Sequence, residues 1–195
     1  MNAVLASFDP LLRPGRRDRR AERRRLKRQD ALSGQLAELH AICALLEQAA
    51  DVVSAGWVQG AWFTVATPRG KRAVTAYGLS MAESSPVTGA CLVGAIVQAA
   101  GGPATVRSQL VQRTLDVTWH ALREDVDRPV QWCPGPRTRM LGVIQLTHWN
   151  DTPERTQNEV IGLLLAAQRT VKAQQDMCRA QQAELATTEA ALIPG

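Results

Sequence analysis

Three side chains in this sequence, Cys91, His148 and Asp151, have the types needed for a catalytic nucleophile, a base and a group that orients the base. Cys91 begins the apolar run CLVGAI after a loop-like stretch, and a thiol at a helix N-terminus can have a lowered pKa. A free cysteine in such a run more often serves as a small buried hydrophobic residue. Residue types alone do not bring the three together, so the sequence favours a structural Cys91 over a cysteine-dependent hydrolase or transferase.

A metal site is the second chemistry that the residue types allow. His40 and Cys43, three residues apart, could supply two ligands from one helix face, with Cys133 or His120 as a third. Cys43 also belongs to a heptad pattern of apolar residues, and no C-x-x-C pair occurs in the chain. We therefore expect no metal and no other cofactor, and we expect the four widely spaced cysteines to be reduced thiols.

Positive charge is concentrated near the N-terminus. Residues 13–28 contain nine arginines and one lysine against Asp18 and Glu22, whereas the net charge of the whole chain is only +5. Such a segment can neutralise phosphates in a sequence-independent, salt-sensitive way, although a solvated tail without a partner has the same composition. No aromatic residue is interleaved, which argues against base stacking. The candidate residues for binding nucleic acid or another polyanion are Arg16, Arg17, Arg19, Arg20, Arg23, Arg24, Arg25, Lys27 and Arg28.

The segment after these cations has the pattern of an amphipathic helix. Apolar residues recur at alternating steps of four and three, which predicts a helix of about 24 residues that starts near Asp30 and ends before Gly56. Only three heptads occur and Cys and Ala fill core positions, so packing within the protein is favoured over a basic zipper. The stripe consists of Leu32, Leu36, Leu39, Cys43, Leu46, Ala50 and Val53.

The next segment predicts a β-hairpin. In residues 57–78, aromatic and β-branched residues flank the turn sequence Pro68-Arg-Gly-Lys. Residues 79–88 predict a loop, because they contain two serines and a proline in succession. The apolar run that follows predicts a short buried helix that ends at the glycine pair 101–102.

Two further helices are predicted in the second half of the chain. The first runs from Pro103 to about Glu124 and is followed by a rigid, proline-rich loop. Residues 140–146 form a short apolar element whose type the pattern does not decide. The last helix, residues 157–186, buries an apolar stripe and continues as a polar extension; the stripe is Val160, Leu164, Ala167 and Val171.

The start of the last helix carries a capping box. Thr156 and Glu159 have the S/T-x-x-E spacing in which the hydroxyl accepts from the Glu159 amide and the carboxylate reaches back. Asp151 and Arg155, four residues apart, are expected to form a local ion pair. Helix capping thus explains most of the polar residues in this stretch without any catalytic role.

These elements predict a mainly α (α+β) fold, a small helical domain with one β-hairpin. We divide the chain into a flexible basic arm (residues 1–30), a single globular domain (31–173) and a helical extension with a tail (174–195). No secretory signal pattern and no apolar run of about 18 residues is present, so a cytoplasmic protein without membrane insertion is expected.

Three motifs resemble a family of actinobacterial and phage-encoded domains of unknown function. The family pattern has a G-W-x-x-G start, a C-x-x-G-A helix and a W-N-D-x-P-x-R-T-x-x-E-V close, and the resemblance covers about residues 45–171. The pattern has no histidine at position 148, which weakens the catalytic interpretation of Cys91. The matching positions are Gly56, Trp57 and Gly60; Cys91, Gly94 and Ala95; and Trp149, Asn150, Asp151, Pro153, Arg155, Thr156, Glu159 and Val160.

The resemblance implies a shared fold and no known reaction. It includes Trp149 and Asn150, which helix capping does not explain. We expect Trp149 to fill a core position and Asn150 to tie its loop to nearby backbone beneath the Cys91 helix.

The sequence therefore favours a non-enzymatic binding or regulatory domain that attaches to nucleic acid or another polyanion through its arginine-rich arm. A hydrolase or transferase using Cys91 is one alternative. The other is a partner-binding subunit of a phage or host assembly that contacts a protein through the helix at residues 157–186.

Overall fold

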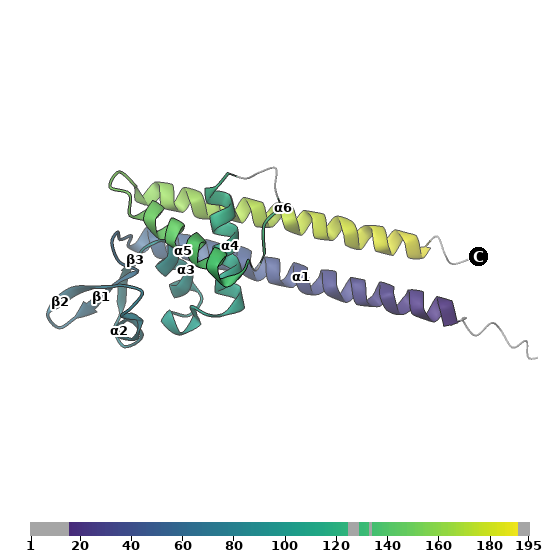
Figure 1. The fold of residues 1–195 in the computed structure, drawn as a ribbon, viewed down its shortest axis with the longest axis horizontal. Coiled ribbons are helices and arrows are strands. Elements are labelled where there is room, and N and C mark those ends of the chain that lie inside the picture. The colour runs from purple at the N-terminus through teal and green to yellow at the C-terminus, as the bar shows by residue number, and fades with distance from the viewer. Residues whose placement is uncertain (1–15, 125–128, 133, 191–195) are drawn as a thin grey trace, which may run out of the picture.

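A computed structural model of the protein describes residues 16–124, 129–132 and 134–190. Two long helices, α1 (Arg16–Ala55) and α6 (Gln157–Ala190), lie side by side, and the rest of the chain packs around one end of this pair (Figure 1). The other described elements are four shorter α-helices, one 3-10 turn and a small antiparallel sheet. The mainly α fold predicted from the sequence, with its long C-terminal helix, is confirmed.

The pairing of α1 with α6 follows from two apolar stripes. On α1, Leu32, Leu39, Leu46 and Val53 recur every seven residues and are buried. Hydrogen bonds near the two ends show that the helices are antiparallel: Gln157 Nε2 donates to the Val53 carbonyl (2.6 Å) and Gln182 Nε2 to Ser33 Oγ (3.2 Å). The stripe on α6 consists of Val160, Leu164, Ala167, Val171 and Cys178, all buried.

The extent of α1 differs from the sequence expectation. The chain was expected to enter a helix near Asp30, after a flexible arm, but α1 is continuous from Arg16. The heptad stripe begins only at Leu32, so periodicity gave no signal for the earlier turns. Arginine, lysine, glutamate and alanine, which dominate residues 16–28, are nevertheless good helix formers, and they extend the helix by propensity.

The expected hairpin is formed by β1 (Phe63–Thr67) and β2 (Gly70–Val74), with Phe63 opposite Val74 and Thr67 opposite Gly70. The expected loop at residues 79–88 is wrong, because this segment contains α2 (Leu79–Glu83) and the start of β3 (Val87–Ala90). β3 pairs with the free edge of β1, which gives the strand order β2-β1-β3. A four-residue strand containing glycine has no periodic pattern, so only this pairing identifies it.

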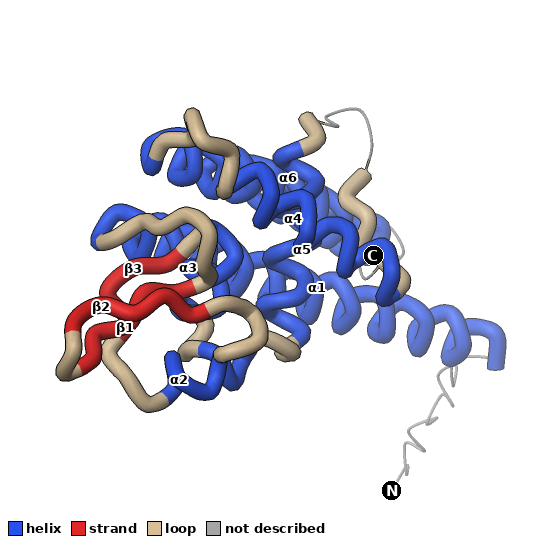
Figure 2. Tube along the Cα trace, turned by 60° about the vertical axis from the view of Figure 1, so that its left-hand side comes forward, coloured by secondary structure: helices blue, strands red, loops and turns tan. Residues whose placement is uncertain are grey.

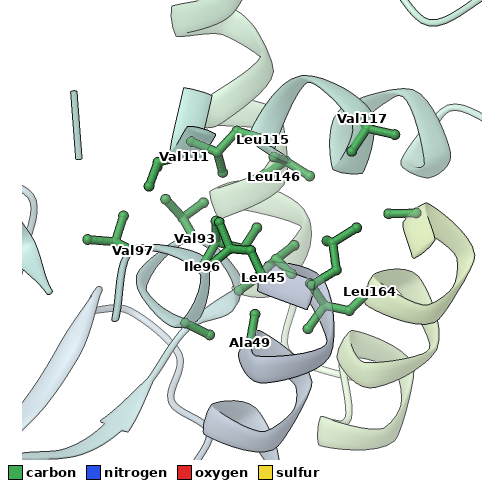
Figure 3. Close-up of a cluster of buried hydrophobic side chains, with 14 of the residues drawn as sticks. Leu45, Ala49, Val93, Ile96, Val97, Val111, Leu115, Val117, Leu146 and Leu164 are labelled. Carbon is green, nitrogen blue, oxygen red and sulfur yellow. The ribbon is translucent and has the colours of Figure 1, made fainter. Parts of the chain in front are cut away.

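The core is organised around α3 (Leu92–Ala99), the short apolar helix predicted from the sequence. Its residues from Leu92 to Val97 are all buried, so neighbours surround this helix on every side. Figure 3 shows side chains from several helices meeting there, including Leu45 of α1, Ile96 of α3 and Leu146 of α5. The close packing leaves no room for a side chain at Gly94, where an added Cβ would lie 2.1 Å from the Trp62 carbonyl oxygen.

Two elements in the second half differ from the prediction. The single helix expected from Pro103 is divided into the 3-10 turn η1 (Pro103–Thr105) and α4 (Gln109–Leu122). Ser108 interrupts it, because its side chain caps α4 by accepting a hydrogen bond from the Val111 amide (3.3 Å).

The short element expected at residues 140–146 is the centre of a longer helix, α5 (Pro136–Asn150), which starts with proline at its first position. An ion pair between Arg139 of α5 and Asp116 of α4 (2.7 Å) joins the two helices. Among the described helices, none combines the length and apolar character that crossing a bilayer requires.

Candidate functional site

Asn150 ends α5 in the centre of a hydrogen-bond cluster, and its side chain is fully buried. Its Oδ1 accepts from Trp57 Nε1 (2.9 Å) and from the backbone amide of Leu92 (3.0 Å). Its Nδ2 donates to the carbonyl of Val58 (3.1 Å) and to Asp151 Oδ1 (2.8 Å). The Asn150 side chain thus joins the end of α5, the segment after α1 and the first turn of α3. In α3 it accepts from the Leu92 backbone N–H, which has no partner within the helix.

The segment after α1 holds the α5–α6 connection from the other side. Gln59 Nε2 donates to the carbonyls of Asn150 (3.0 Å) and Thr152 (2.8 Å), and the Gly60 amide donates to Asp151 Oδ1 (3.0 Å). Gly60 has a φ of +71°, a conformation that favours glycine. Sequence reasoning did not identify Gln59 as a member of this cluster, because its partners lie more than 90 residues away.

The expected Asp151–Arg155 pair does not form. Asp151 is the C-cap of α5 and its carboxylate is held by Gly60 and Asn150. Arg155 instead pairs with Glu159 (2.8 Å), one turn into α6. Position in the helix decides the pairing, because Asp151 ends one helix whereas Arg155 and Glu159 flank the start of the next.

The capping box at the start of α6 has the expected geometry. Thr156 Oγ1 accepts from the Glu159 amide (3.3 Å), and the Glu159 carboxylate accepts from the Thr156 amide (2.8 Å) and from its hydroxyl (2.8 Å). These hydrogen bonds from Thr156, with the nearby charge of Arg155, hold the pKa of Glu159 below its ordinary value. The carboxylate is therefore charged at neutral pH and caps the helix in that form.

Trp149 does not fill a core position as expected, because it is only half-buried. The Arg155 guanidinium lies 4.0 Å from the centroid of its ring, and Arg155 Nε donates to the Trp149 carbonyl (3.2 Å). Trp149 and Arg155 line a cavity of about 750 Å³ between α4 and α6, and Glu159 and Arg169 also line it. Trp149 lies one residue before the buried Asn150, and the turn of the helix places it at the edge of the core.

The catalytic candidates do not form a reactive site. Cys91 is fully buried, and its Sγ caps α3 by accepting from the Gly94 amide (3.3 Å). Burial raises the pKa of the Cys91 thiol to about 12, and the charge of Asp151 adds to the rise. His148 is exposed and lines a different groove, of about 730 Å³, with Trp62 and Met140. Among the described residues, no base is hydrogen-bonded to the Cys91 thiol, and the raised pKa disfavours the thiolate.

We therefore expect Cys91 to be inert towards thiol reagents in the native protein. A pKa of about 12 instead of the ordinary 9.0 lowers the thiolate fraction near neutral pH, so alkylation should be at least about 100-fold slower than in urea. Iodoacetamide labelling, quantified on the Cys91 peptide by mass spectrometry, measures this ratio. The half-buried Cys43 serves as an internal comparison within the same sample. Rapid labelling of Cys91 under native conditions would contradict the structural role.

The metal candidates are also separated. His40 is exposed and its Nε2 lies 3.2 Å from an Arg179 guanidinium nitrogen, and Cys43 packs against the core. Cys133 lies outside the described residues. Among the residues that the structure does describe, no group of three or more His, Cys, Asp or Glu side chains is placed to hold a metal ion.

The basic residues lie on the first turns of α1. Arg16 and Arg17 are in its first turn, and Arg25 is half-buried and pairs with Glu22 (2.8 Å). Arg25 lies one heptad before Leu32, which places it on the side of α1 that faces α6. The exposed members of the set are Arg19, Arg20, Arg23, Arg24, Lys27 and Arg28.

Comparison with known proteins shows that the Asn150 cluster lies inside the region shared with a protein family, whereas the basic turns of α1 lie outside it. No curated protein and no solved structure matches the chain. A family does match over residues 38–170, which contain the Asn150 cluster and exclude the basic turns of α1. This confirms the expectation of a family without an assigned function. The chain belongs to the Family of unknown function (DUF6197).

Proposed function

We propose that the protein binds nucleic acid through the basic N-terminal turns of α1. The observation that carries this proposal is a cluster of exposed cations on a helix that projects away from the folded body (Figure 1). Phosphate contacts of this kind supply affinity that is independent of sequence and falls with salt. The Asn150 cluster, in contrast, is a structural tie, because its hydrogen bonds are made within the protein.

Helical periodicity gathers part of the cluster on one face. Arg20, Arg23 and Lys27 recur at steps of three and four, so they lie in a row along α1. This row is on the face opposite Leu32 and Leu39, which pack towards α6. The row is therefore directed to solvent, and a phosphate backbone can approach it without meeting α6.

The test is a set of charge-neutralised variants in DNA-binding titrations. Replacement of Arg20, Arg23, Arg24 and Lys27 by Gln keeps the helix propensity and removes four exposed charges. If each charge contacts one phosphate, the slope of log K against log salt should fall by about three to four, because each contact contributes about 0.9. Fluorescence anisotropy with duplex DNA at several salt concentrations gives this slope.

A control variant removes three cations from α6, with Arg169, Lys172 and Arg179 replaced by Gln. These side chains are exposed and lie on the other helix of the pair. We expect this variant to bind DNA nearly as well as the wild type. Binding that survives the α1 replacements with its salt slope unchanged would refute the proposal.

The two alternative functions have less support. Burial of Cys91 and the separate position of His148 leave a cysteine-dependent hydrolase or transferase without a nucleophile and base. A phage or host partner that binds the helix at residues 157–186 would need its apolar stripe, and α1 already covers the stripe from Val160 to Cys178. Nucleic-acid binding requires no rearrangement of the described residues.

A further inference from the structure

The tip of the β1–β2 hairpin extends beyond the rest of the sheet. β3 pairs with β1 only at Phe63, Thr64 and Val65, whereas β2 continues to pair with β1 as far as Thr67 and Gly70. The Ala66 amide still donates to the Pro86 carbonyl (2.9 Å), so the hairpin is a two-stranded ribbon only beyond Ala66. Gly70 has a φ of +112° in the turn, and Thr67 Oγ1 donates to its carbonyl (2.7 Å), which fixes the tip.

Three cations surround this tip. Arg69 lies in the turn, and Lys71 and Arg72 are the next residues of β2; all three side chains are exposed. None of the three forms an ion pair with another residue that the structure describes. Successive strand residues point to opposite faces, so Lys71 and Arg72 place positive charge on both sides of the ribbon.

The ribbon and the basic turns of α1 lie at opposite ends of the molecule on the same side. Figure 1 shows the hairpin and the start of α1 at opposite ends of the long axis, with α6 above both in this view. Figure 2, turned by 60°, again shows the hairpin and the start of α1 at opposite sides of the view, with both below α6. The basic row is centred near Arg23, so 32 residues, or about 48 Å of helix, separate it from the end of α1 at Ala55, and the hairpin lies at that end of the molecule (Figure 1).

We propose that the hairpin tip is a second DNA contact, and that one duplex spans the tip and the basic turns of α1. This inference rests on the proposed nucleic-acid binding and identifies its ligand as B-form duplex DNA. The major groove of B-DNA admits a two-stranded ribbon, whereas the deep, narrow major groove of A-form RNA does not, and α1 contacts only phosphates of the same duplex. A separation of at least about 48 Å corresponds to at least about 14 base pairs, at 3.4 Å per pair.

If one duplex spans both contacts, the hairpin cations should contribute to DNA affinity only when the duplex is long enough to reach them. The variant Arg69→Gln, Lys71→Gln, Arg72→Gln is titrated against duplexes of about 12 and about 30 base pairs, which are about 41 and 102 Å long. On the long duplex the variant should bind at least about tenfold more weakly than the wild type, with a salt slope lower by about two to three. On the short duplex the two proteins should agree within about twofold, because α1 dominates the binding there.

Two controls separate charge from fold. The variant Arg69→Lys, Arg72→Lys keeps all three charges and should bind the long duplex like the wild type. The α6 variant with Arg169, Lys172 and Arg179 replaced by Gln loses the same number of charges and should show no dependence on duplex length. A long RNA duplex should show little loss with the hairpin variant, since its major groove does not admit the ribbon.

Failure of this inference differs from failure of the proposed function. If the wild type binds neither duplex, the proposed function and this inference both fail. If the wild type binds and the hairpin variant loses nothing on the long DNA duplex, only the spanning contact is overturned. Cations on an edge strand also prevent pairing with another chain, and a variant that aggregates on light scattering yet binds DNA normally would assign the three residues that role instead.

Discussion

Replacement of Gly94 by Ala is expected to destabilise the protein by at least about 3 kcal/mol, because the added Cβ would enter backbone that cannot move away. The Cβ position lies 2.1 Å from the Trp62 carbonyl oxygen and 3.2 Å from Phe63 Cε1. That carbonyl also accepts a hydrogen bond from the Cys91 amide (3.0 Å), so a shift of Trp62 would break a contact at the start of α3. A loss of this size is a large fraction of the 5 to 15 kcal/mol typical of folded domains.

Urea unfolding followed by circular dichroism measures this loss, and Gly34→Ala is the matched control. Gly34 lies inside α1 with nothing within 4 Å of its Cβ position. Alanine there should be neutral or should stabilise the helix by up to about 1 kcal/mol. Equal stabilities of the Gly94→Ala protein and the wild type would show that α3 can move away from β1, contrary to the packing described.

Replacement of Asn150 by Ala is expected to cost about 3 to 5 kcal/mol, because it leaves several partners of a buried side chain without a hydrogen bond. The groups concerned are the Trp57 indole, the Leu92 amide and the Val58 carbonyl. Asn150→Asp keeps the two acceptor contacts but places a carboxylate beside Asp151, and it should also be destabilising. Thermal unfolding of both variants tests the prediction.

The control for Asn150 is Asn158→Ala. Asn158 is an exposed residue in the first turn of α6, and its replacement should change the stability by no more than about 0.5 kcal/mol. DNA binding through α1 should persist in Asn150→Ala protein that remains folded, because the cluster is distant from the basic turns. A folded, fully stable Asn150→Ala protein that had lost its binding activity would identify the cluster as the functional site instead of a structural tie.

Features that depend on residues close in the sequence were predictable. The capping box needs only Thr156 and Glu159, and both hydrogen bonds were expected from their spacing. The β1–β2 hairpin likewise depends on a short turn between two apolar segments, and it is formed as predicted. Local chemistry decides both, so no knowledge of the rest of the fold was necessary.

Features that depend on distant partners were not predictable. β3 exists because β1 offers an unpaired edge, and the bonds of Asn150 reach residues 58 to 93 positions away. Trp149 was assigned to the core because it belongs to a family motif that helix capping does not explain, but the buried side of α5 is already occupied by Leu146 and Asn150. The three cations of the hairpin tip were visible in the turn sequence, yet so short a run resembles the charges of any exposed edge strand.

The length of α1 sets the distance between the two basic ends of the protein. If one duplex contacts both basic ends, the number of residues in the helix determines how many base pairs lie between the two contacts. Seven extra residues in α1 and seven in α6 would complete nearly two turns in each helix, so the apolar stripes would still meet. The contacts would then be about 10 Å farther apart, or about three base pairs, with the folded body unchanged. Natural variation in helix length could thus alter the footprint on DNA without any change in the residues that touch it.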